Sequence, residues 1–262
     1  MKRLALFGVT GRMGQAVVRA LADSRELVLS GALTAAEDPR IGQPVLAGAK
    51  SGVSIVSDAH VALQGAQVAL DFSQAEAVET HLAACVAARV PLVVAVTGLS
   101  VATQERLQAA ARQVAVLSAA NTSLAVAVMS RLAALAAGCL PQFEVEITEA
   151  HHRMKRDAPS GTALKLGEAV AQARGRTLAE VAVYARHGQS ESRPPDAVGF
   201  SEIRAGDIVG THTVLLAGED ETLEITHRAT DRACFARGAL AAAAWLAGRA
   251  PGLYRMEDVL GF

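Results

Sequence analysis

The chain has 262 residues, of which 51% are hydrophobic and 3% aromatic, and its formal net charge is -1. A charge so close to neutral argues against a general polyanion binder, and so few aromatic side chains argue against base-stacking platforms for nucleic acid. The longest apolar stretches, such as Leu92–Val96 and Leu240–Ala247, are too short to cross a bilayer. The chain is therefore expected to bind neither nucleic acid nor a membrane.

The N-terminus and the cysteines indicate a compartment. A strand pattern begins almost at once, at Leu4–Phe7, and no signal-peptide pattern precedes it. Cys85, Cys139 and Cys234 are odd in number, far apart and outside any metal-ligand spacing. These features favour a reduced, cytoplasmic compartment and predict no metal site.

Apolar runs of strand length alternate with helical patterns through about residue 120. Strands are expected at 3–7, 27–33, 53–56, 68–72, 92–96 and 114–117. Helices are expected at 13–22, about 75–88 and about 100–112, with a glycine-rich connection at 42–52. Buried apolar runs separated by helices predict an α/β fold with a doubly wound parallel sheet.

The pattern changes after residue 120. Ser123 is expected to cap a helix that runs through Ala137 and stops at Gly138. Strands then dominate, at 144–149, about 198–206, 211–217 and 221–229. Several alternate polar with apolar residues, as in the E-V-E-I-T that begins at Glu144. This alternation predicts a second, mixed or antiparallel sheet with one wet face.

Three further segments complete the chain. The polar stretch 185–196 is expected to be a long loop. The segment Arg204–Gly210 contains Gly-Asp and ends in glycine, which predicts a hairpin connection between two strands. The last helix, at about 235–247, is almost all Ala and Leu around Trp245, so we expect it to be buried and to pack on the first domain.

A glycine-rich turn follows the first strand and opens the first helix. Residues 8–14 read G-V-T-G-R-M-G, a spacing variant of the dinucleotide-binding fingerprint. Glycine lets the backbone approach a pyrophosphate at a helix N-terminus. The alternative is a turn that merely packs the helix closely. The motif predicts cofactor contacts from Gly8, Val9, Thr10, Gly11, Arg12, Met13 and Gly14.

The tip of the second strand is expected to influence cofactor preference. An Asp or Glu there would bind the ribose 2′-OH of NAD. Thr34 takes that place, although Glu37 and Asp38 follow. Thr34 would not repel a 2′-phosphate, and Arg12 could contact one. The sequence therefore weakly favours NADPH over NADH. The alternative is a site indifferent to the phosphate.

Two later loops lie where parallel sheets expose the crevice at their carboxyl edge. Thr97-Gly98 follows the fifth strand, and Ala119-Ala120-Asn121 follows the sixth. They are candidates for contact with a nicotinamide ring, the alternative being ordinary turn residues.

Residues 149–162 read E-A-H-H-R-M-K-R-D-A-P-S-G-T. Ser160-Gly161-Thr162 are expected to start a helix, whose N–H groups and hydroxyls suit a carboxylate or phosphate. Lys155 and two arginines add positive charge, and the paired histidines are residues of a type that can take up or release a proton. The stretch predicts a site that holds a small anion and moves a proton. The alternatives are a simple N-cap, a solvated basic turn and a core histidine; a metal site is disfavoured because the basic neighbours repel a cation.

This stretch resembles the signature of the 4-hydroxy-tetrahydrodipicolinate reductase family, also called dihydrodipicolinate reductase, of bacterial lysine biosynthesis. The resemblance covers the whole chain, with G-R-M-G at 11–14, D-F-S at 71–73, A-A-N at 119–121 and L-E-I-T-H at 223–227. It implies a cytoplasmic homotetramer with a Rossmann-type dinucleotide-binding domain, residues 1–122 and 233–262. Residues 123–232 would form the α+β domain for substrate binding and tetramerisation.

The resemblance also implies an oxidoreductase of diaminopimelate and lysine biosynthesis that takes hydride from NADPH or NADH to ring C4 of a cyclic dicarboxylate. His151 is implied as general acid, and Lys155 as proton donor or carboxylate partner. The implied substrate-binding residues are His152, Lys155, Ser160, Gly161 and Thr162. The implied cofactor contacts beyond the glycine turn are Thr34, Ala95, Val96, Thr97, Ala119, Ala120, Asn121 and Thr122.

Four features depart from the family pattern, all on the cofactor side. Thr34-Ala35 replaces an acid followed by Arg, and Ala95-Val96 replaces the Gly-Thr of a G-T-T-G motif. Thr122 replaces a common aromatic residue, and Gln74 replaces a common Arg. Because Val96 has no hydroxyl, nicotinamide binding is expected to differ in detail.

Two other functions are alternatives. A short-chain alcohol dehydrogenase needs Tyr-x-x-x-Lys, but Gly188 follows Tyr184 and Asp258 follows Tyr254 at that spacing. A non-catalytic NAD(P)-sensing homologue would agree with the altered cofactor loops. The presence of both His151 and Lys155 argues against this alternative, because a sensor would not need a proton donor.

Overall fold

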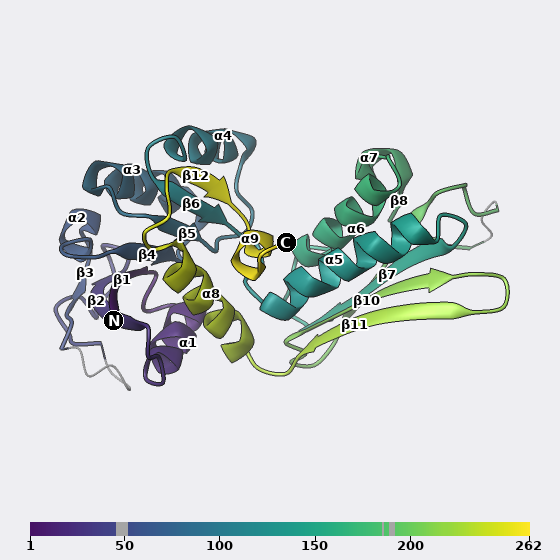
Figure 1. Ribbon diagram of the computed structural model, residues 1–262. Coiled ribbons are helices and arrows are strands. Elements are labelled where there is room, and N and C mark those ends of the chain that lie inside the picture. Colours follow the sequence, from purple (N-terminus) through teal and green to yellow (C-terminus); the bar gives the residue numbers. More distant parts are fainter. Residues whose placement is uncertain (46–51, 185, 189–191) are drawn as a thin grey trace. The chain divides into compact units, whose positions relative to one another are not determined.

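A computed structural model of the chain describes residues 1–45, 52–184, 186–188 and 192–262 (Figure 1). The chain splits into two compact units, Met1–Leu124 with Arg232–Phe262, and Ala125–Asp231. The glycine-rich connection and the polar loop expected from the sequence lie partly outside the described residues. In the part of the chain described, no helix has the length and apolar character needed to span a membrane.

The first unit is built on a parallel sheet which, over the described residues, has seven strands in the order β12-β6-β5-β4-β1-β2-β3. The strands are β1 (Lys2–Phe7), β2 (Leu27–Leu33), β3 (Ile55–Val56), β4 (Val68–Asp71), β5 (Leu92–Val94), β6 (Ala115–Ser118) and β12 (Gly252–Tyr254). All of its ladders are parallel. The order reverses between β1 and β4, and ligands of such sheets bind beside this switch point, at the carboxyl ends of the strands.

Helices cover both faces of this sheet (Figure 1). The longer ones are α1 (Arg12–Leu21), α3 (Val78–Ala88), α4 (Val101–Ala110) and α8 (Ala233–Leu246). Helices α1 and α8 pack together, as do α3 and α4. Shorter elements are α2 (Ala59–Ala62), the 3-10 helix η1 (Ala75–Ala77) and α9 (Met256–Leu260). The alanine-rich α8 is largely buried and contacts β4, β5 and β6, so the expectation that it packs on the first domain is confirmed.

The second unit carries a mixed sheet in the order β11-β10-β7-β9-β8. Its strands are β7 (Glu144–His151), β8 (Ala182–Val183), β9 (Val198–Arg204), β10 (Gly210–Ala217) and β11 (Thr222–Ala229). β7 is parallel to β9 and antiparallel to β10. The helices of this unit are α5 (Leu124–Cys139), α6 (Gly161–Ala173) and α7 (Leu178–Val181). The predicted fold class, a doubly wound parallel sheet plus an α+β unit with a mixed sheet, is confirmed.

Two local predictions for this unit are wrong. The segment Arg204–Gly210 is not a hairpin connection, because β9 and β10 flank β7 and do not pair with each other. It crosses the end of β7 instead, and the Ala205 N–H donates to the His151 carbonyl at 3.0 Å. The helix α5 also continues through Gly138 to Cys139, because this glycine follows the helical path and Leu140 still donates to Ala136.

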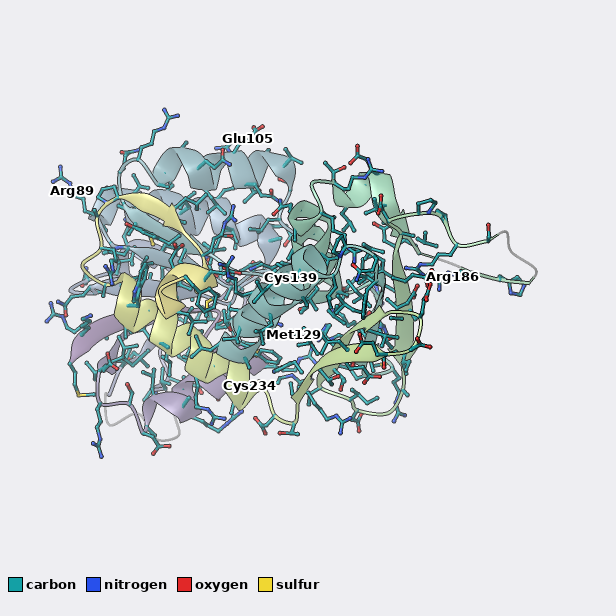
Figure 2. The ribbon with its side chains drawn as sticks, turned by 45° about the vertical axis from the view of Figure 1, so that its right-hand side comes forward. Arg89, Glu105, Met129, Cys139, Arg186 and Cys234 are labelled. Atoms are coloured by element: carbon teal, nitrogen blue, oxygen red, sulfur yellow. The ribbon has the colours of Figure 1, made fainter. Side chains whose placement is uncertain are left out.

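One face of the mixed sheet packs against α5 and α6. Met129 of α5 is buried in this core, whereas Cys139 at the end of the helix is exposed (Figure 2). Alternate residues of β7 enter the same core, beginning with Val145 and Ile147. Continuing along this face, the next two positions are Glu149 and His151.

Candidate active site

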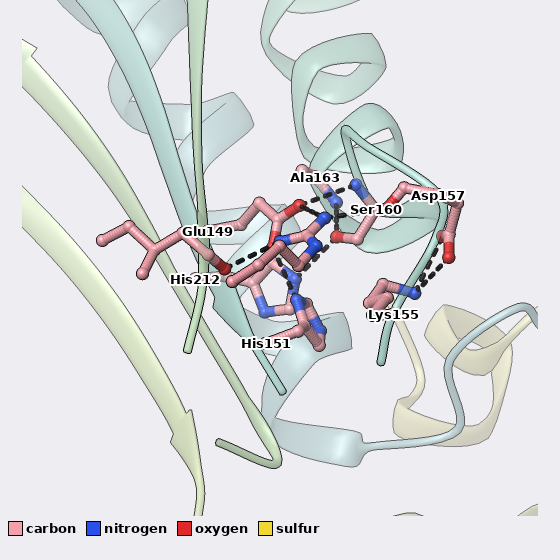
Figure 3. Close-up of polar contacts among 9 residues, drawn as sticks. Glu149, His151, Lys155, Asp157, Ser160, Ala163 and His212 are labelled. Carbon is pink, nitrogen blue, oxygen red and sulfur yellow. Dashed lines mark hydrogen bonds and ion pairs between the residues drawn. The ribbon is translucent and has the colours of Figure 1, made fainter. Parts of the chain in front are cut away.

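Polar side chains gather at the end of the buried face of the mixed sheet. Glu149 is 1% exposed on its side chain, and His151 is 12% exposed. Glu149 is the register partner of His212 on β10, and His151 is the register partner of Arg204 on β9. The side chains of Glu149, His151 and His212 converge in Figure 3. Strand pairing therefore brings together residues that are far apart in the sequence.

Glu149 is the centre of this cluster. Its Oε2 accepts from His151 Nδ1 at 2.5 Å and from Arg204 Nη1 at 2.8 Å. Its Oε1 accepts from Arg204 Nη2 at 2.6 Å and from the Ser160 N–H at 3.0 Å. Burial acts to raise the pKa of Glu149, but the hydrogen bonds from Arg204 and His151 outweigh it and hold the pKa below its usual value. The carboxylate is thus charged and fully engaged.

His151 is oriented by that carboxylate. Because an ionised Glu149 can only accept, Nδ1 of His151 carries a hydrogen and Nε2 is the nitrogen left for exchange. Nε2 of His151 lies beside Gly210: a Cβ atom added to Gly210 would be 3.2 Å from this nitrogen. Burial lowers the pKa of His151 and, with the charges of Lys155 and Arg204, outweighs the opposing effect of Glu149. The ring is therefore neutral near pH 7 until a further negative charge arrives.

His212 packs beside His151 and contacts the start of α6. The two rings are 5.1 Å apart in an edge-to-face arrangement. His212 Nε2 lies 3.0 Å from Ser160 Oγ, which also accepts from the Ala163 N–H at 3.2 Å as the N-cap of α6. Burial, with help from the charge on His151, lowers the pKa of His212 to about 3. His212 is thus a neutral, buried support for the Ser160 hydroxyl.

Lys155 lies in the loop between β7 and α6. Its Nζ donates to both oxygens of Asp157, each at 2.8 Å. The side chain of Asp157 is 60% exposed and that of Lys155 is 22% exposed. Burial acts to raise the pKa of Asp157, but Lys155 outweighs it and lowers the pKa. An incoming anion would compete with Asp157 for the ammonium group.

The predicted residues of this unit are brought together to different degrees. His151 and Ser160 join one network through Glu149 and His212, and α6 begins at Gly161 as expected. His152 supplies its carbonyl to the Lys155 N–H at 3.1 Å. Thr162 is half-buried in the first turn of α6.

The sequence predicts no individual role for Glu149, Arg204 or His212. A signal was available for two of them. Glu149 and His212 occupy apolar-facing positions of strands that alternate polar and apolar residues, and such buried polar groups require partners. The partnership of Arg204 depends on the strand order.

The glycine turn of the first unit has the geometry that a pyrophosphate requires. Gly8 has φ +74°, and a Cβ there would stand 2.7 Å from the Phe72 carbonyl oxygen. A Cβ at Gly14 would overlap the Gly8 carbonyl oxygen. Gly11 is the N-cap of α1 with no side-chain cap bond, and the first turn holds no acid. An uncapped N-terminus beside close-packed glycines fits a dinucleotide phosphate.

Replacing Gly14 with alanine is expected to weaken cofactor binding at least tenfold and to cost about 1–3 kcal/mol of stability, because the turn must open to admit the methyl group. Gly138→Ala is the matched control, since its Cβ would meet its nearest neighbour, the Ala173 carbonyl oxygen, at an ordinary 3.6 Å. Fluorescence titration with NADPH and thermal unfolding measure both effects. Equal behaviour of the two variants would contradict this role for the turn.

The tip of β2 is more polar than the sequence indicated. The buried Thr34 lies 2.6 Å from Thr10, hydroxyl to hydroxyl, and donates to Asp38 at 2.9 Å. Arg40 pairs with Asp38 at 2.7 Å and donates to the Thr10 carbonyl at 3.2 Å. The hydrogen bond from Arg40 holds the pKa of Asp38 well below its usual range. Asp38 thus supplies an acid near the strand tip, with Arg40 as its cation.

The later loops that the sequence predicts to contact the cofactor also belong to the first unit. Val96, Thr97, Gly98 and Ala120 line a pocket of about 370 Å³. Thr122 is buried and donates to the Phe235 carbonyl of α8 at 2.8 Å. A hydroxyl at this position therefore ties the loop to α8, which gives the departure from an aromatic residue a structural reason.

The nearby chain adds two more contacts. The Asn121 side chain accepts from the Ser123 N–H at 2.9 Å, and the Ala95 N–H donates to the Asp71 carbonyl at 2.9 Å. Over the described residues, no group of three or more His, Cys, Asp or Glu side chains has an arrangement that could hold a metal ion.

A Rossmann-type unit with a glycine turn at a helix N-terminus, joined to a unit with a histidine–carboxylate pair, is typical of the dinucleotide-dependent oxidoreductases. The family described as "Dihydrodipicolinate reductase, N-terminus" matches residues 2–122, and "Dihydrodipicolinate reductase, C-terminus" matches residues 125–260. The chain belongs to the dihydrodipicolinate reductase family. Its members use a pyridine nucleotide, and membership supports the predicted reductase over the non-catalytic sensor.

Similar proteins agree with this assignment. The 4-hydroxy-tetrahydrodipicolinate reductase of Thiobacillus denitrificans is 49% identical over 99% of this chain and 98% of the relative. That of Anaeromyxobacter dehalogenans is 47% identical over 100% of this chain and 98% of the relative. A dipicolinate-bound dihydrodipicolinate reductase from a Paenisporosarcina species has the same fold, with a TM-score of 0.78, 23% identity and 97% coverage of both chains.

Proposed function

We propose that the chain reduces 4-hydroxy-tetrahydrodipicolinate to tetrahydrodipicolinate in lysine and diaminopimelate biosynthesis, with His151 as general acid. The observation that carries this role is the 2.5 Å contact of His151 Nδ1 with the buried Glu149, which leaves Nε2 to exchange a proton. The 4-hydroxyl group and a proton from the neighbouring ring carbon leave as water, which gives the unsaturated ring. Reduction of this ring then adds one hydride and one proton. A reduced nicotinamide, when bound, would supply the hydride to ring C4, and His151 Nε2–H would supply the proton.

The charge balance of the site supports proton delivery on substrate binding. Without ligand, burial and two nearby cations favour neutral His151. A dianionic substrate adds negative charge beside the ring and raises the affinity of Nε2 for a proton. When the proton passes to the substrate ring, the Nε2–H bond breaks and His151 returns to its neutral form, still bonded to Glu149 through Nδ1.

The start of α6 and Lys155 are proposed to hold the carboxylates. The N–H groups of Gly161 and Thr162 lie in the first turn of a 13-residue helix, where an anion is favoured. Nδ1 of His212 has no partner among the described residues, so a hydrogen on Nε2 avoids a buried N–H without an acceptor. In that tautomer Nε2 donates to Ser160, whose own hydroxyl hydrogen can bind a carboxylate. His152 is proposed to complete the site.

Dipicolinate, the ligand named for the Paenisporosarcina structure, is a suitable probe. We expect calorimetric titration to show binding that needs the positive charge of Lys155. Binding of equal strength to wild type and Lys155→Ala would contradict this anion site.

The cofactor is proposed to bind through residues 8–14, Thr34, residues 95–97 and residues 119–122, with a slight preference for NADPH. Arg40 supports this preference, because its guanidinium lies at the tip of β2 beside Thr10. Asp38 pairs with Arg40, and its carboxylate suits a ribose hydroxyl, so NADH is also expected to bind.

Arg40→Ala is expected to raise the Kd of NADPH about tenfold or more and that of NADH much less, since only the former has a 2′-phosphate. Arg112→Ala, an exposed arginine after α4, is the control. Equilibrium titrations of both nucleotides measure the difference. Equal losses for NADPH and NADH would show that Arg40 does not read the phosphate.

The two units are also proposed to have separate binding functions. Residues 1–122 with 233–262 would bind the dinucleotide, and residues 123–232 would bind substrate and assemble a homotetramer. The glycine turn in the first unit and the histidine–carboxylate pair in the second support this division.

A further inference from the structure

The buried carboxylate of Glu149, which contacts His151, accepts four hydrogen bonds. The proposed general-acid role of His151 does not by itself require that number of hydrogen bonds. Both oxygens of Glu149 are engaged, two of the four bonds coming from a single arginine. Arg204 also donates to the Asp157 carbonyl at 2.7 Å, so the guanidinium joins the strand end to the Lys155 loop. The arrangement is a continuous path from Arg204 through Glu149 to His151.

We propose that Glu149 and Arg204 are positioning residues that set the tautomer and the proton affinity of His151. Glu149 holds Nδ1–H, which presents Nε2 as the exchanging nitrogen. Arg204 shares the charge of Glu149 and prevents the carboxylate from locking His151 as a permanent imidazolium. The proposal rests on the proposed function, in which His151 delivers a proton and must then take up another.

The strand geometry supports separate roles for the two residues. His151 and Arg204 are register partners on parallel strands, yet the guanidinium bonds to Glu149 in a bidentate manner. Glu149 is therefore placed between the arginine and the imidazole. A bidentate arginine–carboxylate pair has a fixed geometry that lysine does not reproduce, so orientation and charge can be separated by substitution.

The other charges around His151 do not replace this pair. Lys155 faces the ring from the loop, and its charge is shared with Asp157. His212 faces it from β10 and is neutral near pH 7, as its pKa of about 3 implies. His227 on β11 influences the pKa of His212, and so reaches His151 only through His212. Glu149 is the negative group in contact with the ring, and Arg204 is the cation bonded to that group.

The sign of each substitution follows from this arrangement. Removing the charge of Arg204 in Arg204→Gln leaves Glu149 more negative toward His151, so the pKa of His151 rises. Removing the charge of Glu149 in Glu149→Gln withdraws the stabilisation of the imidazolium, so the pKa of His151 falls. Arg204→Lys keeps the positive charge and should stay close to the wild type. A merely structural role would not move the pKa in opposite directions.

The test is an NMR titration of the His151 ring in the full chain, with the signal assigned by its loss in His151→Gln. We expect an upward shift in Arg204→Gln, a downward shift in Glu149→Gln and little change in Arg204→Lys. The pH profile of kcat should follow the same order. At neutral pH kcat should fall about 10²-fold in Glu149→Gln, the lower end of what a placed general acid contributes, while cofactor affinity is retained.

Shifts of the same sign, or none, in the two charge-removing variants would overturn the proposal. If Glu149→Gln does not fold, the comparison of Arg204→Gln with Arg204→Lys still decides, because the Arg204 side chain is 20% exposed whereas that of Glu149 is 1% exposed. An absent difference between those two variants would also overturn it. If His151→Gln retains the wild-type kcat but the pKa of His151 shifts as expected in the Glu149 and Arg204 variants, the general-acid role of His151 is wrong. The coupling of His151 to Glu149 and Arg204 would then still hold. Should kcat fall but the titrations not move, this inference alone fails.

Discussion

Replacing His151 with glutamine is expected to lower kcat by about 10²–10⁴-fold, the usual contribution of a placed general acid. Glutamine approximates the size of the imidazole and can still bond to Glu149, but it cannot deliver a proton. Because the glycine turn and the β2 tip belong to the other unit, the Kd of NADPH should stay within about twofold of the wild type. Steady-state kinetics and nucleotide titrations measure the two effects separately.

His187→Gln is the matched control for this variant, since His187 is an exposed histidine of the same unit. It should retain wild-type kcat and KM. If His151→Gln also retains wild-type kcat, His151 is not the general acid. A parallel loss of nucleotide affinity would instead indicate damage beyond the proton donor.

Replacing Lys155 with alanine is expected to lower kcat/KM by about 10²-fold. The reason is that the variant loses a proposed charge-assisted hydrogen bond to a substrate carboxylate, which would bind and orient the substrate ring. Both KM and kcat should change, since the cation is proposed to bind the substrate and also acts on the affinity of His151 for its proton. Kinetics with the enzymatically generated substrate, and binding of dipicolinate, measure these effects.

Asp157→Asn is the informative companion of that variant. Asp157 bonds to Lys155 with both oxygens, so its carboxylate competes with the substrate for the ammonium group. We expect Asp157→Asn to leave KM unchanged or lower it, the opposite of Lys155→Ala. Unaltered kinetics in Lys155→Ala would show that the lysine serves the loop alone.

The features that the sequence predicted correctly are those in which local pattern and chemistry coincide. Buried apolar runs separated by helices indicated the doubly wound sheet, and polar–apolar alternation indicated the second, mixed sheet. The start of α6 at Gly161 followed from a serine N-cap after a proline. Ends of elements moved by a few residues, as in β5, which stops at Val94.

The features that could not be predicted from the sequence depend on strand order or on loop folding. Gly-Asp between two strands suits a hairpin, and the local pattern cannot show that β7 lies between β9 and β10. That order is what brings Arg204 to Glu149 and His212 to Ser160. Asp38 was recognised as an acid that follows the strand tip, but its contact with Thr34 depends on how the turn folds back and could not be predicted from the sequence. The strand β12 is three residues long, too short for a periodic signal.

This chain is proposed to reduce a cyclic dicarboxylate with a proton from His151. The most direct measurement is the loss of reduced-nicotinamide absorbance when purified protein, saturated with NADPH or NADH, receives enzymatically generated 4-hydroxy-tetrahydrodipicolinate. We expect turnover by the wild type, with NADPH at least as good as NADH, and about 10²–10⁴-fold slower turnover by His151→Gln at the same cofactor occupancy. No oxidation of either cofactor by the wild type, or equal rates for the two proteins, would contradict the account.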